Sequence, residues 1–371
     1  MDITIQREAL LKPLQAVSGI VEKKQTLPIL SNVLLTVKDQ QLLLTATDFE
    51  IELIAIAQLE SGAAPESITV SARKLFDICR ALPENASLRL SLEKNHLVVR
   101  TGESRFALNT LPAKDFPALE EGSYSSQLTL KQHQLKNLLA RTYFAMGQQD
   151  VRHYLNGALL DISANTLKCI AADGHRLALT ELHDVQTGKT EARIILPRKS
   201  VLELIRLLNS DDDANVTMGI GENRIRIVLP EIIFTSKLIN AQYPDYHRLI
   251  PKGNQVILGD RETIKQAFVR AAILSNEKFR GVRLQLENNK LLISANNADQ
   301  EQAEDSVALE YDGDKVEIGF NVGYLLDAVS VMTTEQVRFA LTGASEGVLI
   351  EPVEQAQSAY RSRYVVMPMR L

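Results

Sequence analysis

A short alternating strand followed by an amphipathic helix recurs along the chain with a fixed period. The pattern starts at six places: Ile3, Ile68, Leu128, Ile194, Val256 and Val316. Alternate starts lie about 125 residues apart, and the first two are about 65 apart. A long fixed period is the mark of a repeat protein, so it restricts the fold more than any single motif does.

The segment after each helix completes the repeat. It alternates apolar and polar residues, turns on polar residues and alternates again, which predicts β-hairpins. Each half-unit is therefore expected to have the order β-α-β-β-β. We predict an α+β fold of three similar domains, at residues 1-125, 127-251 and 255-371, with two helices per domain on one side of the sheets. The links at 122–127 and 251–255 contain Gly, Ser, Pro or Asn.

The stretch from Asp260 to Leu284 shows the pattern most clearly. Apolar residues fall on one stripe at helical spacing, namely Ile264, Ala267, Phe268, Ala271 and Leu274, and Asp260 is the expected N-cap. A polar loop follows, and the chain then alternates again from Gly281. We expect the apolar stripe of this helix to pack against its own strands.

Composition places the chain among ordinary globular proteins. It has 371 residues, a hydrophobic content of 45% and a net charge of -5. We expect no membrane span and no signal peptide, and therefore a cytoplasmic location. Cys79 and Cys169 lie in apolar segments, so reduced core thiols are expected more than a disulfide.

One motif invites a catalytic interpretation. Asp173, Gly174, His175 and Arg176 follow one another close to Cys169. However, Asp-Gly between two apolar runs is first of all a hairpin turn. No second His or Cys completes a metal site, and no nucleotide-binding or nucleophile-elbow motif occurs, so neither a metal nor a cofactor is expected. An enzyme that uses Asp173 and His175 remains the weaker alternative.

Basic residues concentrate on the expected helices. Arg73 and Arg80 are seven residues apart, as are Lys199 and Arg206, so each pair is expected to share a helix face. The third helix is expected to carry Lys131, Lys136 and Arg141, whereas the sixth has no basic residue. A basic layer on an acidic protein suits local contacts with phosphates, although surface helices often carry such charges without any ligand.

The segment YVVMPMRL near residue 371 carries two methionines. Either it pairs as a last strand or it lines a groove. Because Met is flexible and polarisable, it suits surfaces that accept several partners.

Together these segments resemble one family. The matching stretches include LLKPLQAVSG, TLPILSNVLL, ARKLFDICRALP, QDVRHYLNG, ADGHRLAL, FTSKLINAQYPDY, QAFVRAAILSNEKFRGVRL and YVVMPMRL. They are similar to the bacterial sliding clamp, the β subunit of DNA polymerase III holoenzyme. The resemblance implies a head-to-tail homodimer that closes as a ring around double-stranded DNA, with helices inside and sheets outside. It implies a processivity factor without catalytic activity, which binds DNA without sequence specificity.

The resemblance also implies a groove for short peptides of the replicative polymerase, the clamp loader and repair proteins. The groove residues would be Leu155, Gly174, His175, Arg176, Leu177, Pro244, Arg248, Val365, Met367, Pro368, Met369 and Arg370. This chain has Ala172 and Leu249 where the family commonly has Thr and Val. Both changes could alter peptide preference without removing the groove.

For DNA, the resemblance implies contacts by Lys24, Arg73, Gln149, His153 and Tyr154. Lys24 stands where Arg is usual, so the charge is kept but the bidentate fork is lost. The argument from helix faces adds a further set: Lys12, Arg80, Arg198, Lys199 and Arg206.

Ring closure would join the first domain of one copy to the third domain of the other. The implied residues are Lys74, Arg105, Phe106, Leu108, Ile273, Leu274, Asp299, Glu301, Glu304 and Asp305. His96 and Glu103 stand where basic residues are usual. We therefore expect fewer ion pairs and an interface held mainly by its apolar patch, since exposed pairs are worth only about 0–1 kcal/mol each.

Overall fold

The computed structural model describes residues 1–21, 27–61, 65–117, 119, 122–187, 190–210, 213–343, 345–353 and 358–370. Contacts between residues group the chain into two compact units. The first contains Met1–Gln132 and Arg206–Leu238, and the second contains His133–Ile205 and Ile239–Leu371. Within the described residues the predicted order β-α-β-β-β occurs six times, which confirms the half-unit.

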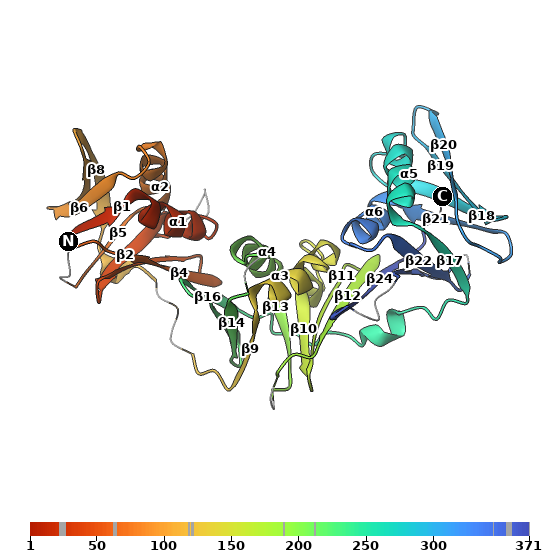
Figure 1. Cartoon of the computed structure of the whole chain (residues 1–371), viewed down its shortest axis with the longest axis horizontal. Coiled ribbons are helices and arrows are strands. Elements are labelled where there is room, and N and C mark those ends of the chain that lie inside the picture. The colour runs from red at the N-terminus through yellow and green to blue at the C-terminus, as the bar shows by residue number, and fades with distance from the viewer. Residues whose placement is uncertain are drawn as a thin grey trace. The chain divides into compact units, whose positions relative to one another are not determined.

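The first unit contains one large antiparallel sheet with two helices on it (Figure 1). The sheet has 12 strands in the order β1-β6-β7-β8-β5-β2-β3-β4-β16-β15-β14-β9. Its elements, in chain order, are β1(Asp2–Gln6), α1(Arg7–Val17), β2(Asn32–Lys38), β3(Gln41–Thr47), β4(Ile51–Gln58), β5(Glu66–Ser71), α2(Ala72–Ala81), β6(Ser87–Glu93), β7(His96–Thr101), β8(Ser104–Leu111), β9(Ser126–Lys131), β14(Asn215–Ile220), β15(Arg224–Val228) and β16(Ile232–Lys237). Pairing of β4 with β16 joins strands from the predicted first and second domains.

The second unit contains two antiparallel sheets. One has the order β13-β10-β11-β12-β24-β23-β22-β17, and the other has the order β20-β19-β18-β21. Its elements are α3(Gln132–Ala140), β10(Gly157–Ser163), β11(Thr166–Ala172), β12(Arg176–His183), β13(Ala192–Pro197), α4(Arg198–Leu207), β17(Gln255–Asp260), α5(Arg261–Ile273), β18(Gly281–Glu287), β19(Lys290–Asn296), β20(Gln302–Ala308), β21(Val316–Asn321), α6(Val322–Ser330), β22(Gln336–Leu341), β23(Val348–Pro352) and β24(Tyr360–Val366). Helix α3 begins at Gln132, the last residue of that segment of the first unit, and helix α4 continues by two residues into the first unit.

Short 3-10 segments connect some of these elements. They are Pro28–Ser31, Ala113–Asp115, Tyr143–Ala145, His153–Asn156 and Tyr246–Leu249. Three of the five, from Tyr143, His153 and Tyr246, lie next to the candidate site.

Two hairpins close with two-residue turns. Asp39 and Gln40 join β2 to β3, and Asn288 and Asn289 join β18 to β19, all with positive φ. This is the backbone of a type I′ turn, whose twist matches that of the flanking strands. The turn fixes the register and thereby decides which side chains of each strand face the helices.

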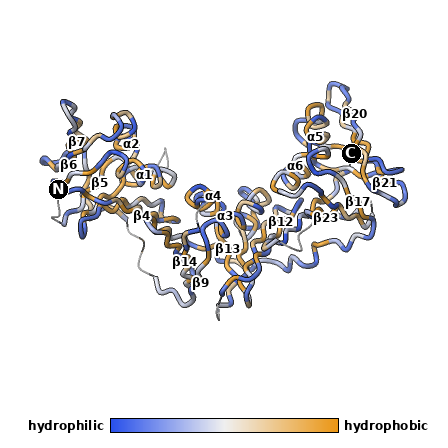
Figure 2. The backbone as a smooth tube through the Cα atoms, in the orientation of Figure 1, coloured by the Kyte–Doolittle hydropathy of each residue, from blue (hydrophilic) through white to orange (hydrophobic). Residues whose placement is uncertain are grey.

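The cores form where the apolar stripes of helices meet the alternating faces of strands (Figure 2). On β3, Leu42, Leu44 and Ala46 are fully buried, and Leu43 and Thr45 between them are half-buried. On α5, Ile264, Ala267, Phe268 and Ala271 are buried, as the stripe predicts. The next member of the stripe, Leu274, lies outside the helix and is only half-buried.

Some local predictions need correction. Lys131 ends strand β9 and Arg141 follows the last residue of α3, so only Lys136 of the three belongs to that helix. The sixth helix begins at Val322, and Asn321 is its N-cap.

Both cysteines are free and buried, as expected. Burial raises the pKa of the Cys79 and Cys169 thiols to about 12, which keeps them protonated and unreactive. Among the described helices, none is long and apolar enough to cross a membrane.

The N-cap of α5 offers a test of local stability. The Asp260 carboxylate accepts hydrogen bonds from the Thr263 backbone N–H at 2.7 Å and from its hydroxyl at 2.5 Å. Asp260→Ala should destabilise the helix by about 1 kcal/mol, which corresponds to roughly fivefold faster amide exchange in α5. Lys265→Ala, inside the same helix, is the control and should leave the exchange nearly unchanged.

The same substitution predicts a pH dependence. The hydrogen bonds from Thr263 lower the pKa of Asp260 below its ordinary value. The cap therefore stabilises the helix fully above the unfolded-state value of about 3.9, and this contribution is lost as pH falls through the lower folded-state value. The difference between wild type and Asp260→Ala should shrink in acid. An undiminished difference there would contradict the assignment of the cap.

Candidate functional site: an apolar groove beside strand β12

The chain segment after β23 is both a strand and a groove wall, so both interpretations of the tail are correct. Strand β24 pairs with β12, with Leu177 opposite Val365, and with β23 on its other side. Beyond the strand, the Met367 N–H donates to the His175 carbonyl at 2.8 Å. This bond holds Met367 beside the β11–β12 turn.

An apolar groove of about 260 Å³ lies along this pairing. It is lined by Arg152, Tyr154, Leu155, Ala172, Gly174, Arg176, Leu177, Tyr243, Pro244, Tyr246, Leu249, Val365 and Met367. Leu155, Leu177 and Val365 are buried within a larger apolar cluster, so they form a firm floor. Leu249 is 53% exposed and Met367 is 43% exposed, so both offer apolar surface to a ligand.

The structure brings most of the predicted groove residues together. Seven of them line the groove: Leu155, Gly174, Arg176, Leu177, Pro244, Val365 and Met367. The others do not line it: His175, Arg248, Pro368, Met369 and Arg370. Arg248 is exposed and pairs with Asp245 at 3.2 Å. Met369 and Arg370 line a separate hollow of about 340 Å³ together with Phe279, and the Met369 N–H donates to the Gly319 carbonyl.

Three groove residues were missed from the sequence: Arg152, Tyr243 and Tyr246. Both tyrosines belong to the stretch QYPDYHR, which brackets Pro244, so that motif could have indicated them. Tyr154, predicted for DNA, also lines the groove and packs edge-on against Tyr243 at 5.9 Å between ring centroids. Burial raises the pKa of Tyr243 well above its ordinary value, and that of Tyr246 to about 12, so both stay neutral.

The Asp173 turn has a structural explanation. The Asp173 carboxylate accepts the backbone N–H of His175 at 2.9 Å and that of Arg176 at 3.0 Å, while Gly174 adopts a φ of 89°. The His175 ring stacks on Tyr324 at 6.3 Å between centroids. Asp173 therefore contacts His175 through its backbone, as in an Asx-turn. No cluster of three or more metal-ligating side chains occurs among the residues that the structure describes.

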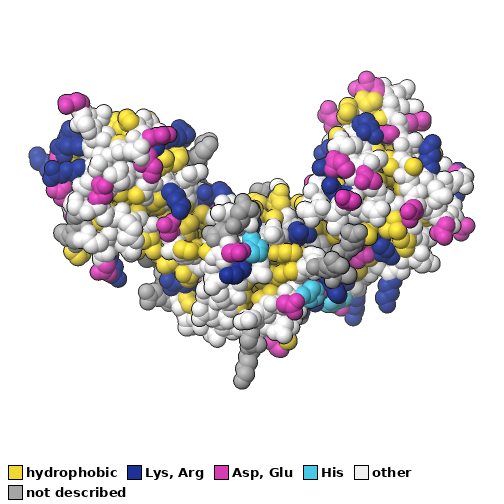
Figure 3. Space-filling model, viewed as in Figure 1, with side chains coloured by type: hydrophobic (Ala, Val, Ile, Leu, Met, Phe, Trp, Pro, Cys, Tyr) yellow, Lys and Arg dark blue, Asp and Glu magenta, His cyan; other side chains and the backbone are white. Residues whose placement is uncertain are grey.

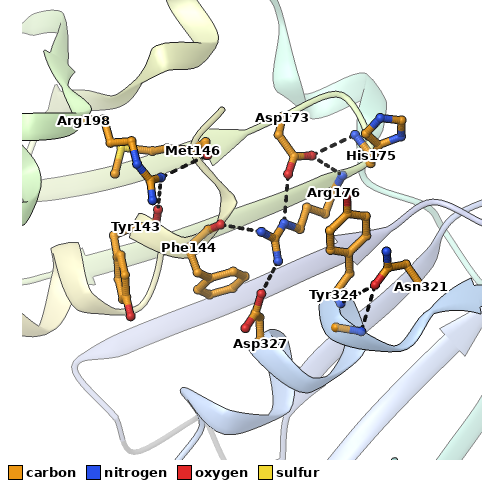
Figure 4. Close-up of polar contacts among 11 residues, drawn as sticks. Tyr143, Phe144, Met146, Asp173, His175, Arg176, Arg198, Asn321, Tyr324 and Asp327 are labelled. Atoms are coloured by element: carbon orange, nitrogen blue, oxygen red, sulfur yellow. Dashed lines mark hydrogen bonds and ion pairs between the residues drawn. The ribbon is translucent and has the colours of Figure 1, made fainter. Parts of the chain in front are cut away.

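The Arg176 side chain connects this turn to two other elements through hydrogen bonds (Figure 4). Its Nε donates to Asp173 at 3.0 Å, one Nη donates to the Phe144 carbonyl at 2.6 Å, and the other donates to Asp327 on α6. The guanidinium also lies over the Tyr324 ring at 4.4 Å. Its side chain is only 12% exposed. Such a planar fork binds several acceptors at once, which a lysine could not reproduce.

The residues predicted to contact DNA lie on several elements. Gln149 and His153 are exposed on the loop before β10, and Gln149 has a φ of 55°. Arg73 and Arg80 share a face of α2 as predicted, but Asp77 lies between them and pairs with both. Lys12 pairs with Glu231 at 2.6 Å. Lys24 lies outside the described residues.

Three further cations of this set lie on α4. Arg198 is half-buried and donates to the carbonyls of Tyr143 and Met146, and burial lowers its pKa. Arg206 is exposed but donates to the carbonyls of Gln15 and Ala16 near the end of α1. Lys199 is half-buried. Basic and acidic side chains intermingle on the visible face, so no single-sign field covers it (Figure 3).

The residues predicted for dimerisation lie on or beside two strands with an open edge. Strand β8 pairs with β7 along its length but with β5 only at Thr110 and Leu111. Strand β20 is the edge of the four-stranded sheet. Ile273 is 74% exposed, whereas Phe106 and Leu274 are half-buried and Leu108 is buried.

The charged members of the same set are mostly exposed. Lys74, Asp299, Glu301 and Glu304 are exposed, as are His96 and Glu103. Arg105 pairs with Glu93 at 3.2 Å, and Asp305 pairs with Arg270 at 2.6 Å. Arg105 and Asp305, both predicted to form ion pairs across the dimer interface, therefore already have partners within their own chain.

Six β-α-β-β-β half-units with an apolar groove along the paired strands β12 and β24 describe the class of repeat proteins that carry a candidate ligand groove. Comparison with known proteins makes this specific. Family models of the DNA polymerase III beta subunit match residues 1–120 (N-terminal domain), 129–245 (central domain) and 247–370 (C-terminal domain).

Curated relatives agree over the full length. The Beta sliding clamp of Pseudomonas putida is 52% identical, and that of Escherichia coli (strain K12) is 47% identical, each covering 100% of both chains. Among solved structures, a DnaN sliding clamp from Pseudomonas aeruginosa bound to griselimycin is 51% identical with a TM-score of 0.95. It covers 100% of both chains. The Caulobacter crescentus pol III beta is 34% identical with a TM-score of 0.93, again over 100% of both chains.

The chain belongs to the family of bacterial β sliding clamps, the β subunits of DNA polymerase III. It is therefore an accessory processivity factor of DNA replication and not an enzyme. The fold is that of the DNA clamp. The catalytic alternative that used Asp173 and His175 is wrong.

The Arg176 contacts yield a stability prediction. Arg176→Met should leave the Asp173 carboxylate, whose side chain is only 16% exposed, without its cationic partner. The free energy of unfolding should fall by about 2–3 kcal/mol. Amide exchange in β12 and α6 should quicken accordingly. The control is Arg193→Met, whose side chain is 53% exposed beside Asp161 and should change stability by less than about 0.5 kcal/mol. Equal effects of the two substitutions would refute the role given to Arg176.

Proposed function

We propose that two copies of this chain close head to tail into a ring around duplex DNA, and that the ring slides while its groove holds a short peptide of the polymerase. Membership of the sliding-clamp family supports the ring, and the observation that carries the peptide site is the groove itself, with its buried floor of Leu155, Leu177 and Val365. The same groove would serve the clamp loader and repair proteins in turn. The griselimycin-bound relative shares the fold and half of the sequence.

The groove suits a linear peptide with a few apolar anchors. Burying one Leu, Met or Phe side chain contributes about 1.5–3 kcal/mol, and two or three anchors must also offset the cost of ordering the peptide. The resulting affinity is modest, so partners can exchange. Ala172 at the floor and Leu249 at the rim would adjust which anchors fit.

A ring removes the need for tight binding to DNA. Non-specific contacts have dissociation constants of roughly 10⁻⁴–10⁻⁶ M, so an open protein with fast association would leave within about milliseconds. A closed ring stays on until its interface opens. Exposed residues such as Arg73, Arg80, Gln149 and His153 then need only weak attraction. The partial neutralisation of Arg73 and Arg80 by Asp77 suits sliding better than gripping.

Ring closure would pair the open edge of β8 in one copy with the open edge of β20 in the other. Unpaired edges are ready templates for another strand. Ile273, which is 74% exposed, and Phe106 would supply the apolar contact. Lys74, Glu301 and Glu304 would surround it as weaker rim pairs.

Three domains at 1-125, 127-251 and 255-371 remain our proposed division. Its support is the repeat of six half-units and the three family models, whose limits fall close to these. We also propose a cytoplasmic location, where a bacterial replication factor meets the chromosome.

A first prediction concerns the groove. Met367→Lys places a charge at its wall and should weaken a polymerase-tail peptide at least tenfold, because the ammonium must be desolvated or displaced. Calorimetry or fluorescence anisotropy measures this. Val228→Lys, a half-exposed apolar position in the other unit, should leave the peptide affinity unchanged. An unaltered affinity in Met367→Lys would show that the peptide binds elsewhere.

A second prediction concerns the interface. Ile273→Asp should convert the dimer to a monomer, because pairing would bury the new carboxylate in an apolar contact. Leu274→Asp should act in the same direction. Sedimentation measures the mass, and Val151→Asp, at a residue that is 89% exposed, is the matched control. An intact Ile273→Asp dimer at low micromolar concentration would exclude this patch.

The ring itself is tested by topology. Protein loaded on nicked circular DNA should stay bound, and cutting the circle should release it by sliding off the ends. An ordinary DNA-binding scaffold would be indifferent to the cut. Retention on the linear product would therefore reject the ring.

A further inference from the structure

The loop from Gly147 to Leu155 belongs to two surfaces at once. Its ends touch, because the Gly147 N–H donates to the Leu155 carbonyl at 2.8 Å. Between them, the side chains of Arg152 and Tyr154 line the groove. The side chains of Gln149 and His153 are exposed and are not part of the groove lining. Any movement of this short loop therefore affects both surfaces.

Asp150 and Asn156 hold the loop in shape. The Asn156 side-chain amide accepts the Asp150 N–H at 2.9 Å and donates to the Asp150 carbonyl at 2.8 Å. The Asp150 carboxylate in turn accepts the Arg152 backbone N–H at 2.8 Å. Gln149, directly before this anchor, is held at a φ of 55°, which costs free energy for a residue with a side chain.

Arg152 connects the anchor to the groove. Its Nε and Nη2 form a bidentate pair with the Asp150 carboxylate at 3.0 and 2.9 Å, and this pair lowers the pKa of Asp150 to about 2. The same guanidinium lies against Gly174 of the β11–β12 turn, where an added Cβ would stand only 2.7 Å from Nη2. A glycine at this turn thus lets the cation reach the groove wall.

A guanidinium has five N–H donors, and the described contacts of Arg152 use two of them. Its side chain is 48% exposed and lines the groove, so a ligand in the groove can reach it. A carboxylate arriving in the groove would compete with Asp150 for the same fork.

We propose that Arg152 is a positioning residue that couples the groove to the exposed face of its own loop. A bound peptide with a carboxylate next to Arg152 draws the guanidinium away from Asp150, and the loop then loses the ion pair that holds Arg152 against the anchor of Asp150 and Asn156. Acidic peptides therefore weaken the contact of this loop with duplex DNA, while peptides that fill only the apolar floor do not. The inference rests on the proposed functions of the groove and of Gln149 and His153.

The test uses two versions of one clamp-binding peptide that differ only in a Glu or Gln flanking the apolar anchors. The affinity of the full-length protein for a short fluorescein-labelled duplex is measured at low salt with each peptide at saturation. We expect the Glu peptide to weaken DNA binding about threefold to fivefold relative to the Gln peptide, a modest effect because the displaced ion pair is half-exposed. By linkage, DNA must weaken the Glu peptide by the same factor.

Variants separate this coupling from plain repulsion between the peptide carboxylate and phosphates. Asp150→Ala and Arg152→Gln each remove the ion pair between Arg152 and Asp150, so the difference between the two peptides should disappear, whereas simple repulsion would persist in both. Val151→Ser, at a side chain that is 89% exposed in the same loop, should keep the full difference. Hydrogen exchange in 147–155 should rise with the Glu peptide in wild type and in Val151→Ser, but not in Asp150→Ala or Arg152→Gln.

Equal DNA affinities with the two peptides in wild type, or a difference that persists in Asp150→Ala and Arg152→Gln, would overturn the coupling. In either case peptide and DNA would still bind, and the proposed function would stand. Loss of all peptide binding or all DNA binding in wild type would instead reject the proposed function itself.

Discussion

Antiparallel pairing between β12 and β24 is the interaction on which the second unit depends. It joins residues that are far apart in the chain, with Arg176 opposite Val366 and Leu177 opposite Val365. The pairing places β24 inside the eight-stranded sheet and brings Met367 to the β11–β12 turn. Without it the groove would lack Val365 from its floor and Met367 from its wall. Arg176 reinforces the same junction through Asp327 and the Phe144 carbonyl.

The groove and the charged loop beside it show how one rigid scaffold can carry weak contacts of two kinds. The floor is fixed, because Leu155, Leu177 and Val365 belong to a buried cluster. The rim is adaptable, because Met367 and Leu249 keep much of their surface exposed. The exposed cations are often shared with nearby carboxylates or carbonyls, as for Lys12 and Arg206. Such a surface attracts phosphates without holding them in one register.

Sequence patterns predicted the local features well. Alternation, helical stripes and turn residues act over a few positions, so the half-unit, the Asp173 turn and the Asp260 cap could all be inferred. Pairing between distant strands could not, because the register of β4 with β16 or of β12 with β24 depends on packing in three dimensions. For the same reason Tyr243 was missed and Arg248 was expected in the groove, although it is exposed beside Asp245. Charge counting also could not show that Arg198 is half-buried against backbone carbonyls.

The position of β24 has a consequence for synthesis of the protein. Strand β12 cannot pair with β24 until the ribosome has synthesised β24, since the paired residues Arg176 and Val366 are 190 residues apart in the chain. At translation rates of about 5–20 residues per second this delay amounts to roughly 10–40 s. During that time the nascent polypeptide exposes one hydrogen-bonding edge of an apolar strand to its neighbours on the polysome. Ribosome-associated chaperones that cover such an edge would therefore raise the yield of this protein.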